Sequence, residues 1–235
     1  MADIIPAILV KSFREVKEDL DIVEGRVHTV QIDVCDGGYV PTKTWPYAAA
    51  GKSDIDFDAL VAQEVGMPYW EELDFEFDLM VRNVYEKIPD FIAAGASALI
   101  VHRNSVNDEE LEKILADYGK GSDALSDFGI HIGLAYPPDP TIVDDVALHI
   151  DHIDFVQVMG IEKVGFQGQP FSEKTIETVR ALRERFPELD ISVDGGINTD
   201  NAKDLIEAGA DKLVVGSSIF GEHDSLDALN DFLSI

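Results

Sequence analysis

The sequence predicts a single α/β domain with a (β/α)₈ barrel fold, and three observations support this prediction. The chain has 235 residues, close to the roughly 250 residues typical of such barrels. Strand-like and helix-like segments alternate along its length, which favours a parallel sheet covered by helices. No Pro/Ser-rich linker and no block of like charges divides the chain, so one domain spanning residues 1–235 is expected.

The alternation begins with the apolar run Ile4–Val10, which predicts a strand, and the helix Ser12–Gly25, with a capping serine and a closing glycine. Periodicity predicts seven further strands: His28–Cys35, Asp74–Val81, Ala98–Arg103, His131–Tyr136, Phe155–Met159, Asp190–Gly195 and Asp211–Gly216. It also predicts seven further helices: Asp54–Val65, Asn83–Ala94, Asp108–Tyr118, Thr141–Ile150, Ser172–Phe186, Thr199–Ala208 and Ser225–Leu233.

The first strand is not followed by the Gly-x-Gly-x-x-Gly turn of an open doubly wound sheet, the main alternative fold. The pattern therefore favours a closed TIM barrel. Residues Lys43–Leu73 add length before the third strand, and we interpret them as an extra lid or an oligomer contact.

Composition excludes several classes of protein. The single cysteine, Cys35, excludes a disulfide framework and a cysteine-rich zinc site, and it favours a reducing compartment. A net charge of -28 argues against nucleic acid or an anionic membrane as partner, because phosphate-rich surfaces would be repelled. The N-terminus has no basic leader, and no segment reaches the roughly 18 apolar residues of a membrane span. A cytoplasmic protein is expected.

Four strands place polar groups on the face opposite their apolar residues. In a barrel one face of each strand meets the helices and the other fills the interior. The alternation assigns these residues to the interior: Gln31, Asp33 and Cys35; Glu76, Asp78 and Met80; His102; and Asp194. A lone inward aspartate is usually satisfied by backbone or water. Convergence from four strands instead predicts an active site at their C-terminal ends, where barrel sites lie, with Glu76 as a structural partner deeper inside.

Glycine-rich turns follow the last three predicted strands: Gly165–Gln169, Asp194–Gly196 and Gly216–Ser218. Each alone is typical of a tight turn. Together, at one face of a barrel, they predict a phosphate site built from backbone N–H groups and a short helix N-terminus. Such a site needs no Lys or Arg, so an acidic protein can hold an anionic substrate.

Matching stretches are spread over nearly the whole chain: IIPAIL, IDVCDGGYVP, DLMVRNVYEKIPDFIAAGA, the VH of the fourth strand, GFQGQPF, SVDGGIN and AGADKLVVGSSIFG. Together they resemble the ribulose-phosphate 3-epimerase family. The resemblance implies a phosphate-binding barrel that interconverts D-ribulose 5-phosphate and D-xylulose 5-phosphate by inverting C3. It also implies a metal ion held by two histidines and two aspartates.

By this resemblance, Asp33 and Asp194 are the acid/base pair, because inversion needs one carboxylate on each face of the carbon. Met80 and Met159 match methionines that line the family's site. The residues implied in phosphate binding are Gly165, Phe166, Gln167, Gly168, Gly195, Gly196, Gly216 and Ser217. The implied partner is a small sugar phosphate, and a homo-oligomer is expected from the family.

The sequence departs from the family at both metal histidines, where Gln31 and Asp78 stand instead. Ala7 replaces a usual serine, Cys35 a usual methionine, and the loop GIEKVGFQG has one extra residue. One interpretation is an all-oxygen ligand set of Gln31, Asp33, Asp78 and Asp194, which favours Mg²⁺ or Mn²⁺ over zinc.

Other interpretations stay open beside an oxygen-ligated isomerase. In one, Asp78 is not a ligand, and the enzyme works on a changed substrate or without metal. In another, the protein binds a sugar phosphate without epimerising it. A related barrel enzyme, such as an aldolase or synthase for another sugar phosphate, is a further alternative. Lys163 can partly replace a metal's charge, although a solvated loop lysine is its simpler interpretation.

Overall fold

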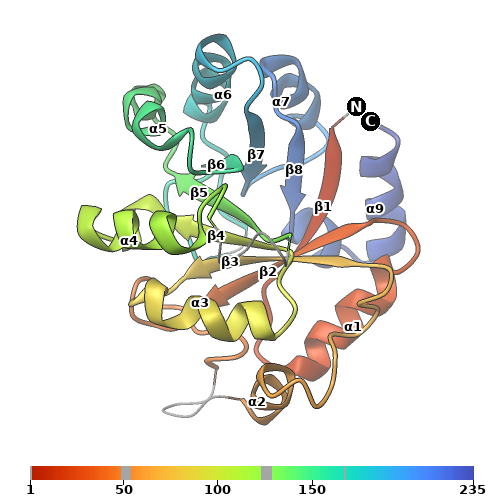
Figure 1. Ribbon diagram of the computed structural model, residues 1–235. Helices are drawn as coiled ribbons and strands as arrows, with labels where there is room; N and C mark the ends of the chain where they lie inside the picture. The colour runs from red at the N-terminus through yellow and green to blue at the C-terminus, as the bar shows by residue number, and fades with distance from the viewer. Residues whose placement is uncertain (1, 49–53, 123–128, 167) are drawn as a thin grey trace.

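The computed structural model describes residues 2–48, 54–122, 129–166 and 168–235, and it confirms the predicted barrel. Within these ranges eight parallel strands pair in sequence order and close, β8 pairing with β1 (Figure 1). The strands are β1 (Asp3–Ile8), β2 (Thr29–Cys35), β3 (Asp74–Met80), β4 (Ala98–His102), β5 (His131–Tyr136), β6 (Phe155–Met159), β7 (Asp190–Asp194) and β8 (Lys212–Val215).

Helices follow the strands and cover the outside of the barrel, as Figure 1 shows. They are α1 (Phe13–Val23), α2 (Ile55–Val61), α3 (Val84–Ala93), α4 (Asp108–Tyr118), α5 (Val143–His149), α6 (Lys174–Arg185), α7 (Ala202–Ala208), α8 (Ser217–Phe220) and α9 (Ser225–Leu233). The one-turn helices η1 (Arg103–Ser105) and η2 (Pro140–Ile142) precede α4 and α5.

Local interactions explain where individual helices begin and end. Ser12 caps α1 by accepting a hydrogen bond from the Glu15 N–H at 3.3 Å, and the Glu15 carboxylate accepts one from the Lys11 N–H at 3.0 Å. This reciprocal arrangement satisfies backbone donors that the helix cannot pair itself.

The predicted helix Asp54–Val65 was too long: α2 ends at Val61, and Gln63 has a left-handed backbone with φ 56°. The short helix α8 was not predicted, because four residues carry no helical period.

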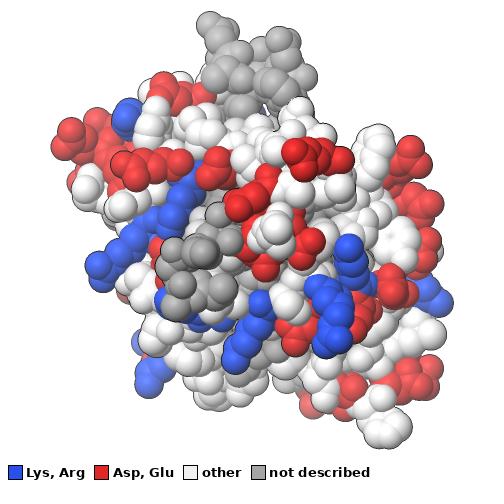
Figure 2. Space-filling view, turned by 90° about the horizontal axis from the view of Figure 1, so that it is seen from below, with Lys and Arg blue, Asp and Glu red and all other residues white. Residues whose placement is uncertain are grey.

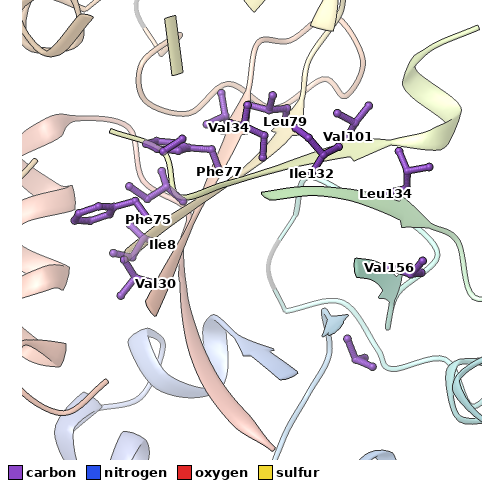
Figure 3. Close-up of a cluster of buried hydrophobic side chains, with 14 of the residues drawn as sticks. Ile8, Val30, Val34, Phe75, Phe77, Leu79, Val101, Ile132, Leu134 and Val156 are labelled. Atoms are coloured by element: carbon purple, nitrogen blue, oxygen red, sulfur yellow. The ribbon is translucent and has the colours of Figure 1, made fainter. Parts of the chain in front are cut away.

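The hydrophobic core lies between the barrel and the helices. In each strand, apolar residues at alternate positions point outward to meet the helices, and Figure 3 shows this arrangement for β1 to β6. The labelled side chains are Ile8, Val30, Val34, Phe75, Phe77, Leu79, Val101, Ile132, Leu134 and Val156, all buried. Because side chains alternate along a strand, burying this set against the helices turns the polar set into the barrel.

The long segment after β2 packs on the outside of the barrel. Trp45 is buried, stacks on Phe13 with ring centroids 5.2 Å apart, and meets the edge of Phe57 at 5.6 Å. Thr44 holds the segment to the end of β2, since its Oγ1 donates to the Asp33 carbonyl at 2.7 Å. The described part of residues 43–73 contributes no side chain to the cavity over the aspartates. The interpretations as a lid or an oligomer contact stay predictions, and residues 49–53 lie outside the described ranges.

The surface carries the charge of the chain. Acidic side chains are spread over the face in Figure 2, with Lys and Arg between them. None of the described helices is both long and apolar enough to cross a membrane.

Replacing Phe77 by Ala tests the assigned core. Phe77 is fully buried on β3, with its ring centroid 5.2 Å from that of Phe91. We expect the free energy of unfolding to fall by roughly 3–5 kcal/mol, since the lost aromatic ring leaves a cavity. Urea unfolding measures the change. Ile55→Ala on α2 is the control, because Ile55 is 83% exposed and should change stability by no more than about 0.5 kcal/mol. Equal effects would contradict the assigned core.

Candidate active site

Three aspartates from different strands meet inside the barrel near the C-terminal ends of β2, β3 and β7. Asp33, Asp78 and Asp194 are buried, and each offers a carboxylate oxygen within 4.8 Å of the others. Strand register explains part of this arrangement, because Asp33 of β2 pairs laterally with Asp78 of β3. The inward placement predicted from the period of two is therefore what the structure shows for these side chains.

Two glutamines hold the aspartates from below. Gln31 lies one inward position deeper than Asp33, and its Nε2 donates to Asp33 Oδ1 at 2.8 Å and to Asp194 Oδ2 at 3.0 Å. Gln157 of β6 donates to the same Asp194 oxygen at 3.4 Å. A single amide thus joins the two carboxylates that the sequence analysis paired. The Gln31 Oε1 atom is buried and finds no hydrogen-bond partner among the described residues.

Asp78 is paired with a histidine of the neighbouring strand. His102, the last residue of β4, places Nε2 2.8 Å from Asp78 Oδ1, and both side chains are buried. The other oxygen, Oδ2, is enclosed without a hydrogen-bond partner in the part of the chain that the structure describes. The ring of Tyr39 lies against the imidazole, with centroids 5.6 Å apart.

Burial and the charges of neighbouring carboxylates shift Asp33 and Asp194 toward their protonated forms. Burial is the main cause of the raised pKa of Asp33, followed by the charges of Asp194 and Asp78. Burial and the charge of Asp78 raise the pKa of Asp194 to about 7, against the lowering effect of the Gln31 hydrogen bond. The physical reason is that a poorly solvated space disfavours the ionised form of a carboxyl group, and neighbouring negative charges add to this effect. The site therefore favours a shared proton or a bound cation.

The donor set fits a hard divalent cation. Carboxylate and amide oxygens are the ligands that Mg²⁺ and Mn²⁺ prefer. Asp78 Oδ2 and Gln31 Oε1 are buried oxygens without partners, and such atoms are costly unless something binds them. Among residues 2–48, 54–122, 129–166 and 168–235, the three aspartates form the one group of His, Cys, Asp and Glu close enough to share an ion.

A cavity opens above the aspartates toward the glycine-rich loops. It is lined by Asp33, Asp194, the two methionines Met80 and Met159, and by Gly165, Phe166, Gly168, Gly195, Gly196, Gly216 and Ser217. Gly196 must be glycine here, because its φ is 68° and a Cβ would lie 2.9 Å from the Phe171 Cα. The predicted phosphate residue Gln167 lies outside the described ranges.

Several other predicted side chains lie away from the cavity or contribute only packing. Lys163 is exposed and does not line it. The Cys35 sulfur lies 3.9 Å from that of Met80, and burial raises the pKa of the thiol, so that it stays protonated. Glu76 has the structural partner expected, an ion pair with Lys212 at 2.8 Å toward the N-terminal end of the barrel.

Sequence reasoning left two residues of this site without a role. Gln157 was missed, although the period of two in FVQVM places it inside, between the outward-facing Val156 and Val158. His102 was placed inside, but nothing in the sequence indicated that it meets Asp78.

Known ribulose-phosphate 3-epimerases are similar to this protein over most of its chain. A model of the ribulose-phosphate 3 epimerase family matches residues 3–220. The chloroplastic ribulose-5-phosphate-3-epimerase of Arabidopsis thaliana is 29% identical over 229 residues, covering 95% of this chain and 73% of that protein. The ribulose-phosphate 3-epimerase of Escherichia coli K12 is 28% identical over 236 residues, covering 98% and 94%. A structure of 3-hexulose-6-phosphate synthase from Salmonella typhimurium has a TM-score of 0.67 at 16% identity, covering 99% and 97% of the two chains, a likeness of fold.

The raised pKa values predict a pH dependence of stability in the metal-free protein. The folded state keeps the Asp194 proton up to a pKa of about 7, whereas an ordinary aspartate loses it near 3.8. The folded state thus binds more protons between these values, so the free energy of unfolding should fall as the pH rises through this range. Asp194→Asn should remove a decrease on the order of a few kcal/mol, since one pKa unit corresponds to about 1.4 kcal/mol.

Urea unfolding in the presence of a chelator, repeated across that pH range, measures this difference. Asp144→Asn is the control, because Asp144 is exposed on α5 and its replacement should leave the wild-type slope unchanged. Parallel curves for the wild type and Asp194→Asn would contradict the assigned pKa.

Proposed function

Because the chain belongs to the ribulose-phosphate 3-epimerase family, we propose that it inverts C3 of a ketopentose phosphate, converting D-ribulose 5-phosphate to D-xylulose 5-phosphate. The observation that carries this proposal is the pair Asp33 and Asp194. They come from separate strands of the barrel, both line one cavity, and both accept hydrogen bonds from the same Gln31 amide.

The proton transfers follow from the state of this pair. Removing the proton next to a ketone gives an enediolate, and inversion requires a base on one face and an acid on the other. Burial raises both pKa values, and the charges of neighbouring carboxylates raise them further, which favours one ionised and one protonated partner. The ionised carboxylate takes the C3 proton, the protonated one returns a proton to the opposite face, and the roles exchange in the reverse reaction.

A divalent metal ion would be held by Gln31, Asp33, Asp78 and Asp194. When bound, such an ion supplies Lewis-acid stabilisation of the negative charge that develops on the substrate oxygens. The all-oxygen donors support Mg²⁺ or Mn²⁺ rather than zinc. Gln31 would have to turn its amide to offer Oε1 in place of Nε2.

The glycine-rich wall supports a phosphate group as the other end of the substrate. Gly165, Gly168, Gly195, Gly196 and Gly216 line the cavity, and close approach of bare backbone lets N–H groups bind an anion without a lysine or arginine. Met80 and Met159 provide an apolar lining beside the carboxylates. We also propose that the protein is cytoplasmic, since its single cysteine favours a reducing compartment. A homo-oligomer is proposed from the resemblance to the family.

A second candidate is a protein that binds the sugar phosphate without epimerising it. The observation that favours it is the replacement of both expected histidines, by Gln31 and Asp78. The retained aspartate pair is the reason to place catalysis first.

The first test is NMR of D-ribulose 5-phosphate in D₂O with chelator-treated protein, before and after addition of Mg²⁺, Mn²⁺ or Zn²⁺. We expect deuterium at C3 and formation of D-xylulose 5-phosphate, with Mg²⁺ or Mn²⁺ most effective. Asp33→Asn and Asp194→Asn should each lower turnover at least about 100-fold, the range of a lost general acid or base. Asp144→Asn is the exposed control.

Retained turnover in both aspartate variants would refute the assignment of these residues. Binding without deuterium exchange, under every metal condition, would favour the second candidate. Carbon–carbon cleavage products would instead indicate a related aldolase or synthase.

A separate test restores the missing histidines. If Gln31 and Asp78 hold one ion, Gln31→His with Asp78→His should raise the affinity for zinc, which prefers imidazole ligands more than Mg²⁺ does. Competition with a chromophoric zinc chelator measures the affinity. Lys163→His on the exposed loop is the control for an added histidine. Unchanged zinc affinity in the double variant would mean that the two side chains do not share an ion.

A further inference from the structure

Asp78 is the most enclosed of the three carboxylates, and its two oxygens have different surroundings. Its side chain is 0% exposed. Oδ1 lies 2.8 Å from His102 Nε2, whereas Oδ2 is buried without a partner in the described ranges. Oδ1 is therefore engaged by the imidazole, which leaves Oδ2 as the oxygen available for an ion.

His102 is itself fixed in place. It ends β4, its carbonyl accepts a hydrogen bond from Ser105 Oγ at 2.8 Å, and the Tyr39 ring lies 5.6 Å away, centroid to centroid. Its side chain is only 3% exposed. With its backbone fixed by Ser105 and its ring packed against Tyr39, the imidazole presents Nε2 to the Asp78 carboxylate.

We propose that His102 is a positioning residue for a metal ligand: its Nε2–H bond fixes the Asp78 carboxylate so that Oδ2 faces the other two aspartates. This inference rests on the proposed metal-dependent function. It follows because a carboxylate with two free oxygens rotates about its Cβ–Cγ bond, whereas one anchored through Oδ1 is held in a single orientation. Partners that orient a ligand in this way typically change metal affinity 10–100-fold when removed.

A buried histidine beside a metal ion can have one of two roles. In direct coordination, the imidazole nitrogen would bind the metal. In the role proposed here, the nitrogen donates a hydrogen bond to Asp78, and only oxygen atoms coordinate the metal. Mn²⁺ distinguishes the two roles, because a directly bound ¹⁴N gives a characteristic coupling in pulsed electron paramagnetic resonance.

The experiment compares Mn²⁺ affinity in the full-length, metal-stripped wild type and two variants. His102→Leu removes the donor and should weaken Mn²⁺ binding about 10–100-fold. His102→Gln keeps an N–H near the position of Nε2 and should retain most of the affinity. His152→Leu is the control for loss of an exposed histidine. Should His102→Leu fail to fold, His102→Asn replaces it, since its shorter amide does not reach Asp78.

The pulsed spectrum of the wild type should show no directly bound nitrogen. A coordinated ¹⁴N signal that disappears in His102→Gln would overturn the inference and make His102 a ligand. Equal Mn²⁺ affinity in the wild type and His102→Leu, with epimerase activity intact in the wild type, would overturn the inference alone. A wild type that binds no Mn²⁺ would refute the metal-dependent function and the inference with it.

Discussion

Three carboxylates enclosed within 4.8 Å of one another have to be compensated by protons, donors or a cation, and the site is arranged around that requirement. Gln31 donates N–H bonds to Asp33 and Asp194, and His102 Nε2 lies within hydrogen-bond distance of Asp78. These bonds offset only part of the repulsion, because amide hydrogen bonds carry no net charge. Together with burial, the remaining repulsion raises the pKa values of Asp33 and Asp194, and it would favour both the proton transfer and the cation binding proposed for this site.

Most of the fold could be predicted because the alternation of apolar and polar residues in each strand determines which face points into the barrel. In VQIDVCD the apolar residues must meet the helices, so Gln31 and Asp33 have to face inward whatever the neighbouring strands do. The same argument put Asp78 and Asp194 inside. The glycines that line the cavity could be predicted for a related reason: bare backbone in three successive loops is meaningful once the loops are known to share one face of the barrel.

What could not be predicted depends on relations between strands. Period two places His102 and Asp78 inside, but their contact depends on how β4 is shifted along β3, where Asp78 pairs with Ile100 rather than with His102. That shift is set by closure of the whole barrel and leaves no mark in either strand alone. Gln157 reaches Asp194 across β6 and β7 for the same reason. The donor direction of the Gln31 amide is likewise decided by its surroundings, not by its own segment.

The ion pair of Lys212 and Glu76 helps to close the N-terminal end of the barrel. With Nζ and Oε1 2.8 Å apart, Lys212 also lies over the Phe155 ring, 4.8 Å from its centroid, and that ring fills the space beside Gly133. The base of the barrel is thus plugged by packed and neutralised side chains. The cavity over the aspartates opens at the other end, where the glycine-rich loops line it. In the proposed reaction, substrate and product would therefore pass the same glycine-rich loops and compete for one cavity.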